Sequence, residues 1–306
     1  MDIAIVGLGH AFEKQINAIR SFENIENIEL CDKDEQKIKK YKAKSSYMSL
    51  SKKNVLIATS PIYHLEIAKN LIKDKKKIIL EKPVVISRNE LGELKKIINK
   101  DNYYNSLHFS FGLEINYFMK KINKKPIKIY SYISDNYVYK NRIRKNKLGL
   151  CGSYLDEVIN PLSAISRIFG YNIFFKDVLK KYYKDNEYDY YSKSQFNIEE
   201  IPVTIEVLWN DKPSKKYIDL YYENYIIRLD SMKQEVINLT EGKVLFKGSG
   251  DRMTNHYIGV FNDYIKNKSN IEQSIKLHEE LLKGVWDEKD NSFRWSTRSR
   301  KNNDSI

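Results

Sequence analysis

The sequence predicts an α/β fold in which a doubly wound parallel sheet is followed by a second domain built on a mostly antiparallel sheet. In the first half, short apolar runs alternate with longer amphipathic segments, which is typical of a parallel sheet covered by helices on both faces. In the second half, runs rich in Val, Ile, Tyr and Thr alternate between apolar and polar residues, which indicates an antiparallel sheet with one packed face. A chain of 306 residues is long enough for two domains.

The predicted elements of the first half come in strand–helix pairs. Runs such as VLIA and KIIL are largely apolar throughout, as expected for strands buried on both faces of a covered sheet. In the first helix, Ile16 and Ile19 supply an apolar side. The predicted strands are residues 2–7, 28–31, 54–59, 77–80 and 104–108, and the predicted helices are residues 12–22, 35–42, 64–73 and 89–99.

The pattern changes near residues 124–126, where we place the domain boundary. We therefore expect a first domain of residues 1–124 and a second of residues 125–306, with a flexible, polar and basic tail from about residue 290. The strands predicted in the second domain are residues 126–139, 201–207, 216–222 and 225–229, and the helices are residues 153–169, 256–266 and 271–285.

Composition argues against several functional classes. There are 53 Lys and Arg against 40 Asp and Glu, but the basic residues are scattered and accompany no nucleic-acid-binding motif, so we expect no nucleic-acid partner. No run approaches the roughly 20 apolar residues of a membrane helix. Two cysteines, Cys31 and Cys151, are too few for a disulfide framework or a four-thiolate metal site. We expect no metal, no membrane association and a reducing, cytoplasmic location.

The first residues favour the same location. Asp2 follows Met1, and the apolar run at residues 3–6 is shorter than the roughly 7–15 apolar residues of a secretory signal. We therefore expect no export by that route.

A glycine-rich turn, GLGHAF, lies directly after the first predicted strand and opens the first predicted helix. Gly7 and Gly9 suit a backbone that approaches a pyrophosphate, because a Cβ atom there would collide with the phosphates. The amides of His10 and Ala11, at the helix N-terminus, would supply donors. Phe12 stands where the dinucleotide fingerprint has a third Gly or Ala, so the turn alone is also compatible with ordinary packing.

Asp32 strengthens the interpretation of this turn as a dinucleotide site. It ends the second predicted strand, 23 residues after Gly9. A carboxylate there accepts hydrogen bonds from both ribose hydroxyls and repels a 2′-phosphate, which favours NAD(H) over NADP(H). Lys33 beside it weakens that preference, because a cation can pair with a 2′-phosphate.

Two motifs between residues 55 and 84 carry the most specific pattern in the chain. One strand ends in the turn ATSPIYH, with Ala58, Thr59, Pro61 and His64, and the next strand ends in EKP at residues 81–83. This pairing resembles the glucose-fructose oxidoreductase/inositol dehydrogenase/rhizopine catabolism (Gfo/Idh/MocA) oxidoreductases. The resemblance extends weakly to about residue 284, and it implies an N-terminal Rossmann domain and a second α/β domain with a large open sheet.

The resemblance also implies which residues border the cofactor. Both motifs leave their strands at the carboxyl end, where cofactors lie on open parallel sheets. The residues expected to bind the cofactor in these two motifs are Thr59, Ser60, Pro61, His64, Glu81 and Lys82.

Lys82 is the leading candidate for a catalytic role. At the edge of the sheet, its amine is expected to hydrogen-bond the substrate oxygen near the nicotinamide or to shuttle the proton of that oxygen. The ordinary pKa of a lysine is about 10.4, so base work near neutrality requires desolvation or nearby positive charge. The alternative is a lysine that only pairs with a carboxylate.

The helix predicted after residue 152 departs from the family pattern. In the family, a glycine-rich turn precedes D-x-x-x-H, whose Asp and His work with the EKP lysine. Asp156 matches the Asp, but Asn160 stands at the His position. An i, i+4 spacing on a helix puts both side chains on one face. Because an amide does not exchange a proton near neutral pH, Asn160 is expected to orient a substrate rather than act as an acid or base.

Three explanations for Asn160 remain open. Lys82 carries the proton alone or with a hydroxyl such as Tyr154, which we also count among the substrate-binding candidates. Alternatively His108 or His256 reaches the site, or the protein binds its cofactor without efficient turnover.

A basic run and two tyrosine clusters complete the candidates. In KNRIRKNK, Arg142 and Arg144 are candidates to bind a phosphate or carboxylate of the substrate, and the alternative, which we favour slightly, is a solvated loop. The tyrosines at residues 182–191 and 217–225 suit either sugar stacking or a subunit interface, and we favour the interface. The resemblance implies a homodimer or homotetramer joined through the C-terminal sheet.

The sequence therefore predicts an NAD(H)-dependent oxidoreductase that acts on a secondary alcohol or ketone of a sugar, a nucleotide-linked sugar or a cyclitol. Lys82, Asp156 and Asn160 are the expected catalytic residues, and Asp156 and Asn160 also hold the substrate hydroxyls. The alternative is a cofactor- or sugar-binding regulatory protein on the same fold.

Overall fold

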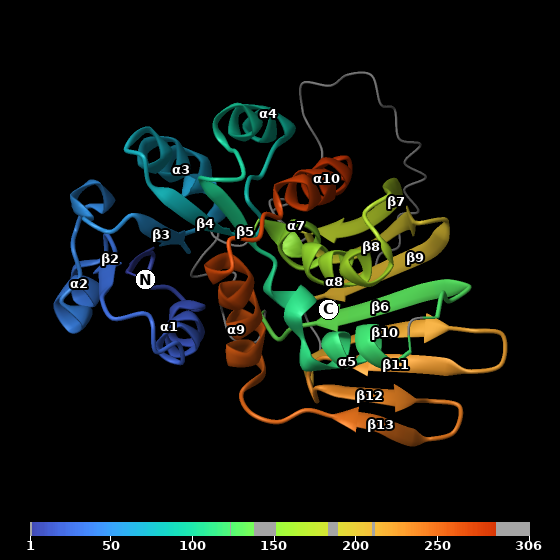
Figure 1. The fold of residues 1–306 in the computed structure, drawn as a ribbon. Helices are drawn as coiled ribbons and strands as arrows, with labels where there is room; N and C mark the ends of the chain where they lie inside the picture. The colour runs from blue at the N-terminus through green and yellow to red at the C-terminus, as the bar shows by residue number, and fades with distance from the viewer. Residues whose placement is uncertain (1, 123, 138–150, 183–188, 210–211, 286–306) are drawn as a thin grey trace.

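The computed structural model describes residues 2–122, 124–137, 151–182, 189–209 and 212–285. Figure 1 shows a smaller sheet formed by the N-terminal part of the chain beside a larger sheet formed by the C-terminal part. The α/β fold class, with a doubly wound parallel sheet and a second, mostly antiparallel one, is confirmed.

The first sheet has the order β2-β1-β3-β4-β5, and its neighbouring strands are all parallel. Its strands are β1 (Ile3–Val6), β2 (Ile28–Cys31), β3 (Asn54–Ile57), β4 (Lys77–Glu81) and β5 (Tyr103–Ser106). The helices between them are α1 (Phe12–Arg20), α2 (Glu35–Tyr41), α3 (His64–Lys73) and α4 (Arg88–Ile97), with the short 3₁₀ helices η1 (Tyr47–Ser49) and η2 (Pro61–Tyr63).

Helices cover both faces of this sheet, and one of them comes from the far end of the sequence. Ile3 and Ile5 pack with α1 and with α9 (Arg252–Ile265), whereas Ala4 and Val6 belong to the core under α3 and α4. The packing of α9 against the first sheet therefore connects the C-terminal part of the chain to the N-terminal part. The domain boundary at residue 124 stays a prediction.

The second sheet has eight strands in the order β13-β12-β11-β10-β6-β9-β8-β7. Only the pair of β6 and β9 is parallel among the pairs that the described residues form. Its strands are β6 (Lys128–Ser134), β7 (Ile173–Tyr182), β8 (Asp189–Ile198), β9 (Ile201–Leu208), β10 (Lys215–Tyr221), β11 (Ile226–Asp230), β12 (Glu235–Asn238) and β13 (Lys243–Lys247).

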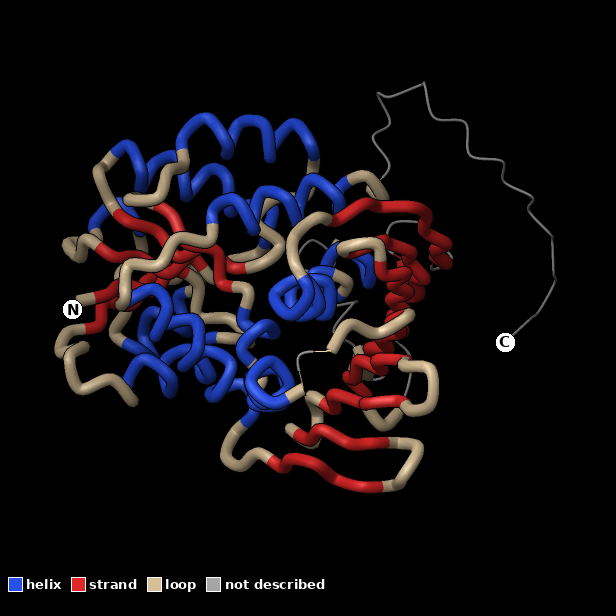
Figure 2. Tube along the Cα trace, turned by 45° about the vertical axis from the view of Figure 1, so that its right-hand side comes forward, coloured by secondary structure: helices blue, strands red, loops and turns tan. Residues whose placement is uncertain are grey.

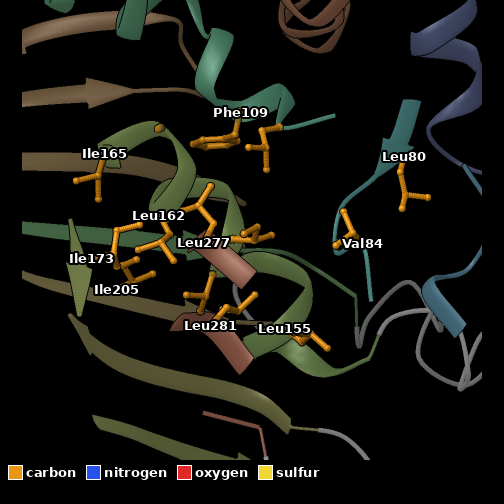
Figure 3. Packing of buried hydrophobic residues seen from close by; sticks show 14 of the residues in the cluster. Leu80, Val84, Phe109, Leu155, Leu162, Ile165, Ile173, Ile205, Leu277 and Leu281 are labelled. Atoms are coloured by element: carbon orange, nitrogen blue, oxygen red, sulfur yellow. The ribbon is translucent and has the colours of Figure 1, made fainter. Parts of the chain in front are cut away.

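Helices line the side of the second sheet that faces the first domain, as Figure 2 shows with the sheet at the right. They are η3 (His108–Phe111), α5 (Leu113–Lys121), α7 (Gly152–Glu157), α8 (Ile159–Phe169) and α10 (Ile271–Leu282). Their apolar side chains form one continuous core with the inner face of the sheet: Leu162 and Ile165 of α8 lie near Ile205 of β9, with Leu277 and Leu281 of α10 beside them (Figure 3).

Three predicted elements differ from the structure. The helix predicted at residues 153–169 is two helices that meet at Val158. Pro161 explains the break, because it has no N–H to bond the carbonyl four residues earlier. The strand predicted at 104–108 ends at Ser106, and His108 begins η3. The alternating pattern at residues 126–139 yields a shorter strand, β6, and residues 138 and 139 lie outside the described ranges.

Four strands and one helix escaped prediction. They are the strands β7, β8, β12 and β13 and the helix α5. Their apolar and polar residues follow neither the regular alternation of a strand nor the 3.6-residue period of a helix. Among the described helices, none has the length and apolarity needed to cross a membrane.

Candidate active site

The glycine-rich turn lies at the carboxyl edge of the parallel sheet, between the ends of β1 and β3. Gly7 has φ +96°, and a Cβ atom on it would lie 2.6 Å from the carbonyl oxygen of Ala58. Gly7 is therefore required by close packing of the two strand ends. A Cβ atom on Gly9 would meet nothing within 4 Å, so the backbone of Gly9 faces open space. This open space next to a helix N-terminus fits the pyrophosphate of a dinucleotide.

Asp32 lies beside this turn and helps to hold it. Its carboxylate accepts hydrogen bonds from the backbone amide of Leu8 at 2.7 Å and of Asp34 at 2.9 Å, and Lys37 lies 3.3 Å away. Burial opposes the charged form, but these donors outweigh it and lower the pKa of Asp32. An ionised carboxylate next to the glycine turn fits the predicted contact with a ribose.

His64 joins the two motifs rather than facing a cofactor. Its ring is buried, with Nδ1 2.9 Å from the carbonyl oxygen of Pro83 and Nε2 3.1 Å from that of Thr59. Burial lowers the pKa of His64 to about 4, so the neutral ring donates to one of these two carbonyls at a time. His64 therefore bridges the ATSP and EKP turns, and its predicted cofactor contact stays a prediction.

Glu81 is likewise buried inside the first domain. Its carboxylate accepts hydrogen bonds from Gln15 at 2.8 Å and Ser106 at 2.9 Å, and burial raises its pKa. Glu81 thereby ties the end of β4 to α1 and β5. The Glu81 side chain therefore points into the protein interior and fixes the backbone next to Lys82.

Lys82 and Asp156, predicted from separate motifs, are in direct contact. The Lys82 ammonium donates to the backbone carbonyl of Asp156 at 2.7 Å and to its carboxylate at 3.0 Å. Burial disfavours the ammonium, but the charges of Asp156 and Glu157 outweigh burial and raise the pKa of Lys82. Lys82 is therefore a cation held at the edge of the sheet, suited to donate a hydrogen bond to a substrate oxygen.

The first turn of α7 is fixed by a carboxylate from the second sheet. Asp189 of β8 accepts from the Ser153 hydroxyl at 2.5 Å and from the Tyr154 amide at 2.7 Å. Gly152 has φ +83°, and a Cβ atom on it would lie 2.2 Å from Asp189. Only glycine fits there, which explains why a glycine begins this helix.

A second cluster of charged residues lies next to Asp156. Lys216 of β10 contacts Asp135 at 2.6 Å and Glu157 at 3.4 Å. The side-chain amide of Asn160 donates to the same Glu157 oxygen at 2.8 Å. These side chains are all largely buried. Asn160 thus points into a network of charges rather than toward an apolar core.

The pKa values of two carboxyl groups in this cluster, on Asp135 and Glu157, are shifted in opposite directions. Burial, together with the charge of Glu157, raises the pKa of Asp135 to about 6, although Lys216 opposes the shift. For Glu157, burial is outweighed by the charges of Lys216 and Lys82, and its pKa falls to about 2. The two side chains also share a hydrogen bond, so their titration belongs to the pair.

The other predicted substitutes for a histidine are not placed to exchange protons readily. Tyr154 is fully buried and donates its hydroxyl to the carbonyl of Leu281 at 2.8 Å, and its predicted substrate contact stays a prediction. Burial lowers the pKa of His256 to about 3, and burial with the charge of Lys82 also lowers that of His108. Both rings are neutral and enclosed at neutral pH.

The remaining predicted residues divide into two groups. Thr59, Ser60 and Pro61 follow β3 at the same edge as Gly9, and His10 lies exposed in the glycine turn with Ala11. Arg142 and Arg144 lie outside the described residues.

Two hollows of about 240 and 140 Å³ are lined by none of the predicted site residues. Within the described ranges, no group of three or more His, Cys, Asp or Glu is arranged to hold a metal ion.

Sequence reasoning missed three residues of the charged cluster and one supporting histidine. Lys216 occupies an inward position of β10 in line with the apolar Ile218 and Leu220, and a charge in such a position is a signal that the sequence contained. Glu157 directly follows the motif aspartate. His278 accepts from the amide of Val84 at 3.1 Å and so anchors the EKP turn to α10, but no sequence pattern marks it.

Comparisons with known proteins agree with this arrangement. Residues 1–108 match the Gfo/Idh/MocA family model, described as an oxidoreductase family with an NAD-binding Rossmann fold. A search of curated proteins finds no match.

Solved structures share the fold over nearly the whole chain. Myo-inositol 2-dehydrogenase from Lactobacillus plantarum is 15% identical, with a TM-score of 0.75 over 92% of this chain and 95% of that one. The 3-ketoreductase KijD10 from Actinomadura kijaniata, solved with NADP and TDP-benzene, is 11% identical, with a TM-score of 0.76 over 92% and 94%. GenD2 from gentamicin A biosynthesis, solved with NAD, is 11% identical, with a TM-score of 0.76 over 93% of both chains. The family model thus covers the first part of the chain, and the solved structures extend the shared fold over nearly all of it.

Proposed function

We propose that this protein is an NAD(H)-dependent oxidoreductase that interconverts a secondary alcohol and a ketone on a sugar, a nucleotide-linked sugar or a cyclitol. The observation that carries the proposal is the Lys82 ammonium, held by Asp156 at the same sheet edge as the open glycine turn. The substrate class is supported by the structural relatives, whose names include an inositol dehydrogenase and a ketoreductase.

The residues present fit a dinucleotide. The turn around Gly9 has room for the pyrophosphate, the Asp32 carboxylate lies beside it for the ribose, and Thr59 follows the neighbouring strand. The cofactor, when bound, supplies the hydride chemistry. Asp32 favours NAD(H), because its negative charge repels a 2′-phosphate.

Lys82 polarises the reacting oxygen in this mechanism. Its raised pKa keeps the amine protonated, so it donates a hydrogen bond to the substrate oxygen and stabilises negative charge that develops there. Asp156 holds the ammonium through two acceptors and so orients it. Asn160, tied to Glu157, is suited to orient a substrate hydroxyl but not to exchange its proton.

The second candidate function is a regulatory protein that binds cofactor or sugar without turnover. The observation that favours it is Asn160 at the position where the family has a histidine. Tight NADH binding together with no turnover on any polyol or sugar would support this second function.

We also propose self-association and a cytoplasmic location. The outer face of the second sheet carries a group of partly exposed tyrosines, Tyr130, Tyr132, Tyr191 and Tyr217, which suits contact with another copy of the chain. Light scattering of wild type and a variant with Tyr132 and Tyr217 changed to Ser tests the proposed self-association, because the variant is expected to have a lower mass.

The proposed cytoplasmic location is supported by the two cysteines, which are free thiols as expected in a reducing compartment.

The test of the main proposal follows absorbance of reduced nicotinamide while the wild type is incubated with NAD⁺ and a panel of inositols, sugars and nucleotide sugars. Lys82→Met should lose at least about 100-fold in turnover on any substrate found, as for removal of one electrostatic catalytic group, while NADH still binds. Lys95→Met is the matched control, because Lys95 is exposed and pairs with Glu279 away from the site. Unchanged turnover in Lys82→Met would exclude the proposed role.

A further inference from the structure

We propose that Asp135 and Glu157, bridged by Lys216, form a proton-holding pair that takes the place of an imidazole in this chain and exchanges protons with the Lys82 site. This inference rests on the proposed function. It assigns a role to three residues that lie outside the recognised motifs, and it answers which group handles protons when Asn160 cannot.

The geometry brings these residues together from three elements. Asp135 follows β6, Glu157 ends α7, and Lys216 lies on β10, which pairs with β6 in the sheet. Lys216 contacts Asp135 at 2.6 Å and Glu157 at 3.4 Å. The position of the family histidine is connected to the same cluster, since Asn160 donates to Glu157.

The charges of the cluster favour the uptake of a proton. Three carboxyl groups, on Asp135, Asp156 and Glu157, meet two ammonium groups, on Lys82 and Lys216, in a largely buried region. His108 and His256, on which the charge of Lys216 acts, are neutral and add no positive charge. When all five groups are ionised, one buried negative charge is left in excess, and this excess raises the pH at which the cluster takes up a proton.

Asp135 is the group whose protonation changes most easily. Its pKa is raised to about 6 by burial and the charge of Glu157, against the charge of Lys216. Among the described residues, Tyr137, whose hydroxyl lies 3.4 Å from Glu157, and Asn160 also contact the pair. Glu157 further interacts through its charge with Lys82 and Asp156. The pair therefore gains or loses its proton near neutral pH, which an asparagine cannot do and which the buried histidines do only at low pH.

The pair is connected to Lys82 through adjacent residues. Glu157 follows Asp156 in the chain, and the charges of both raise the pKa of Lys82. When the alcohol is oxidised, its carbon loses a hydride with the electron pair of the C–H bond, and its oxygen loses a proton. The deprotonated pair takes up one proton for each proton released at the Lys82 site and then returns it to water. In the reverse direction the pair supplies the proton that the new hydroxyl gains.

The first experiment does not depend on a substrate. The full chain is labelled with ¹³C at the Asp and Glu carboxyl carbons, and the carboxyl resonances are followed by NMR between pH 4 and 8. One resonance should titrate near pH 6 and should be lost in Asp135→Asn. In Lys216→Met it should titrate at higher pH, because removing a cation raises the pKa of a neighbouring carboxyl. This second variant assigns the resonance if Asp135→Asn does not fold.

Asp219→Asn is the matched control. Asp219 is a buried carboxylate on β10 that pairs with Arg228 on the opposite face of the sheet, so its removal should leave the resonance unchanged. If no carboxyl resonance titrates between pH 5 and 7, or if Lys216→Met leaves the titration unchanged, the inference is overturned.

The second experiment separates this inference from the proposed function. In the oxidation direction, wild-type kcat should rise with pH through about 6, and Asp135→Asn should lose that rise and at least tenfold in kcat with KM little changed. An unchanged profile in Asp135→Asn, alongside lost turnover in Lys82→Met, rejects the pair and keeps the proposed function. Unchanged turnover in Lys82→Met rejects the proposed function, whatever the NMR titration shows.

Discussion

The ammonium of Lys82 donates to two acceptors on Asp156, its backbone carbonyl at 2.7 Å and its carboxylate at 3.0 Å. The two residues are 74 positions apart and come from different domains of the expected division. Their contact therefore depends on how the parallel sheet and α7 are packed together. It also gives the candidate site its electrostatic character, since a lysine with two acceptors stays charged.

The first prediction concerns the stability of this ion pair. Lys82→Met and Asp156→Leu should each lower the free energy of unfolding by about 3 kcal/mol, because each leaves a buried charge without its partner. The double variant should lose less than the sum of the two, by about 1–3 kcal/mol. Urea denaturation of the four proteins measures this coupling. Strictly additive losses would indicate that the two side chains do not interact in solution.

The second prediction separates the two glycines of the turn. Gly7→Ala should lower the free energy of unfolding by at least about 2 kcal/mol, because φ at Gly7 is +96° and the new Cβ would press on the carbonyl of Ala58. Gly9→Ala has no such neighbour within 4 Å, so it should fold as well as the wild type but bind NADH more weakly. Thermal melting and NADH titration distinguish the two. Equal NADH affinity in Gly9→Ala and wild type would argue against a pyrophosphate at this turn.

The third prediction concerns the choice of cofactor. Asp32→Ser removes the charge that repels a 2′-phosphate and leaves Lys37, which lies 3.3 Å from Asp32, without its partner. The ratio of the NADH Kd to the NADPH Kd should rise at least tenfold, measured by fluorescence titration. Asp34→Ser is the control: it removes a charge two residues away, and serine still caps α2. The same shift in both variants would mean that overall charge, rather than Asp32, sets the preference.

Local sequence patterns were sufficient to predict the parallel sheet and its edge. The strands β1 to β4 are short and largely apolar runs. Gly7, Asp32 and Lys82 follow three of them directly, and Thr59 follows β3 after one residue, so their shared edge follows from parallel pairing alone. These four residues could thus be grouped before any coordinates existed.

The charged cluster could not be predicted in the same way. Asp135 and Lys216 are 81 residues apart, and they meet only because β6 and β10 pair in one particular register. A shift of one residue would turn Lys216 to the outer face. The inward turn of His64 and Glu81 also depends on tertiary burial, which a motif match does not contain. Long-range packing therefore determines which predicted residues are buried next to the site instead of facing its open side.

The last prediction uses the pH dependence of stability. The imidazole of His256 is fully buried, has no hydrogen-bond partner within the described part of the chain, and lies against Phe109 with ring centroids 5.6 Å apart. Burial lowers its pKa to about 3. Because this folded-state pKa lies below the unfolded value of about 6.5, the stability contributed by the neutral ring is complete above pH 6.5 and is lost as the pH falls toward 3.

At pH 5 the loss from this one ring should be about 2 kcal/mol, since protonation is available only to the unfolded chain. His256→Phe fills the same buried space and cannot be protonated. It should match or exceed wild-type stability at pH 7 and lose about 2 kcal/mol less between pH 7 and pH 5. Urea denaturation at both pH values measures the difference. If wild type and His256→Phe lose the same stability on acidification, the ring must already take up a proton in the folded protein, which would return His256 to the list of groups able to serve Lys82.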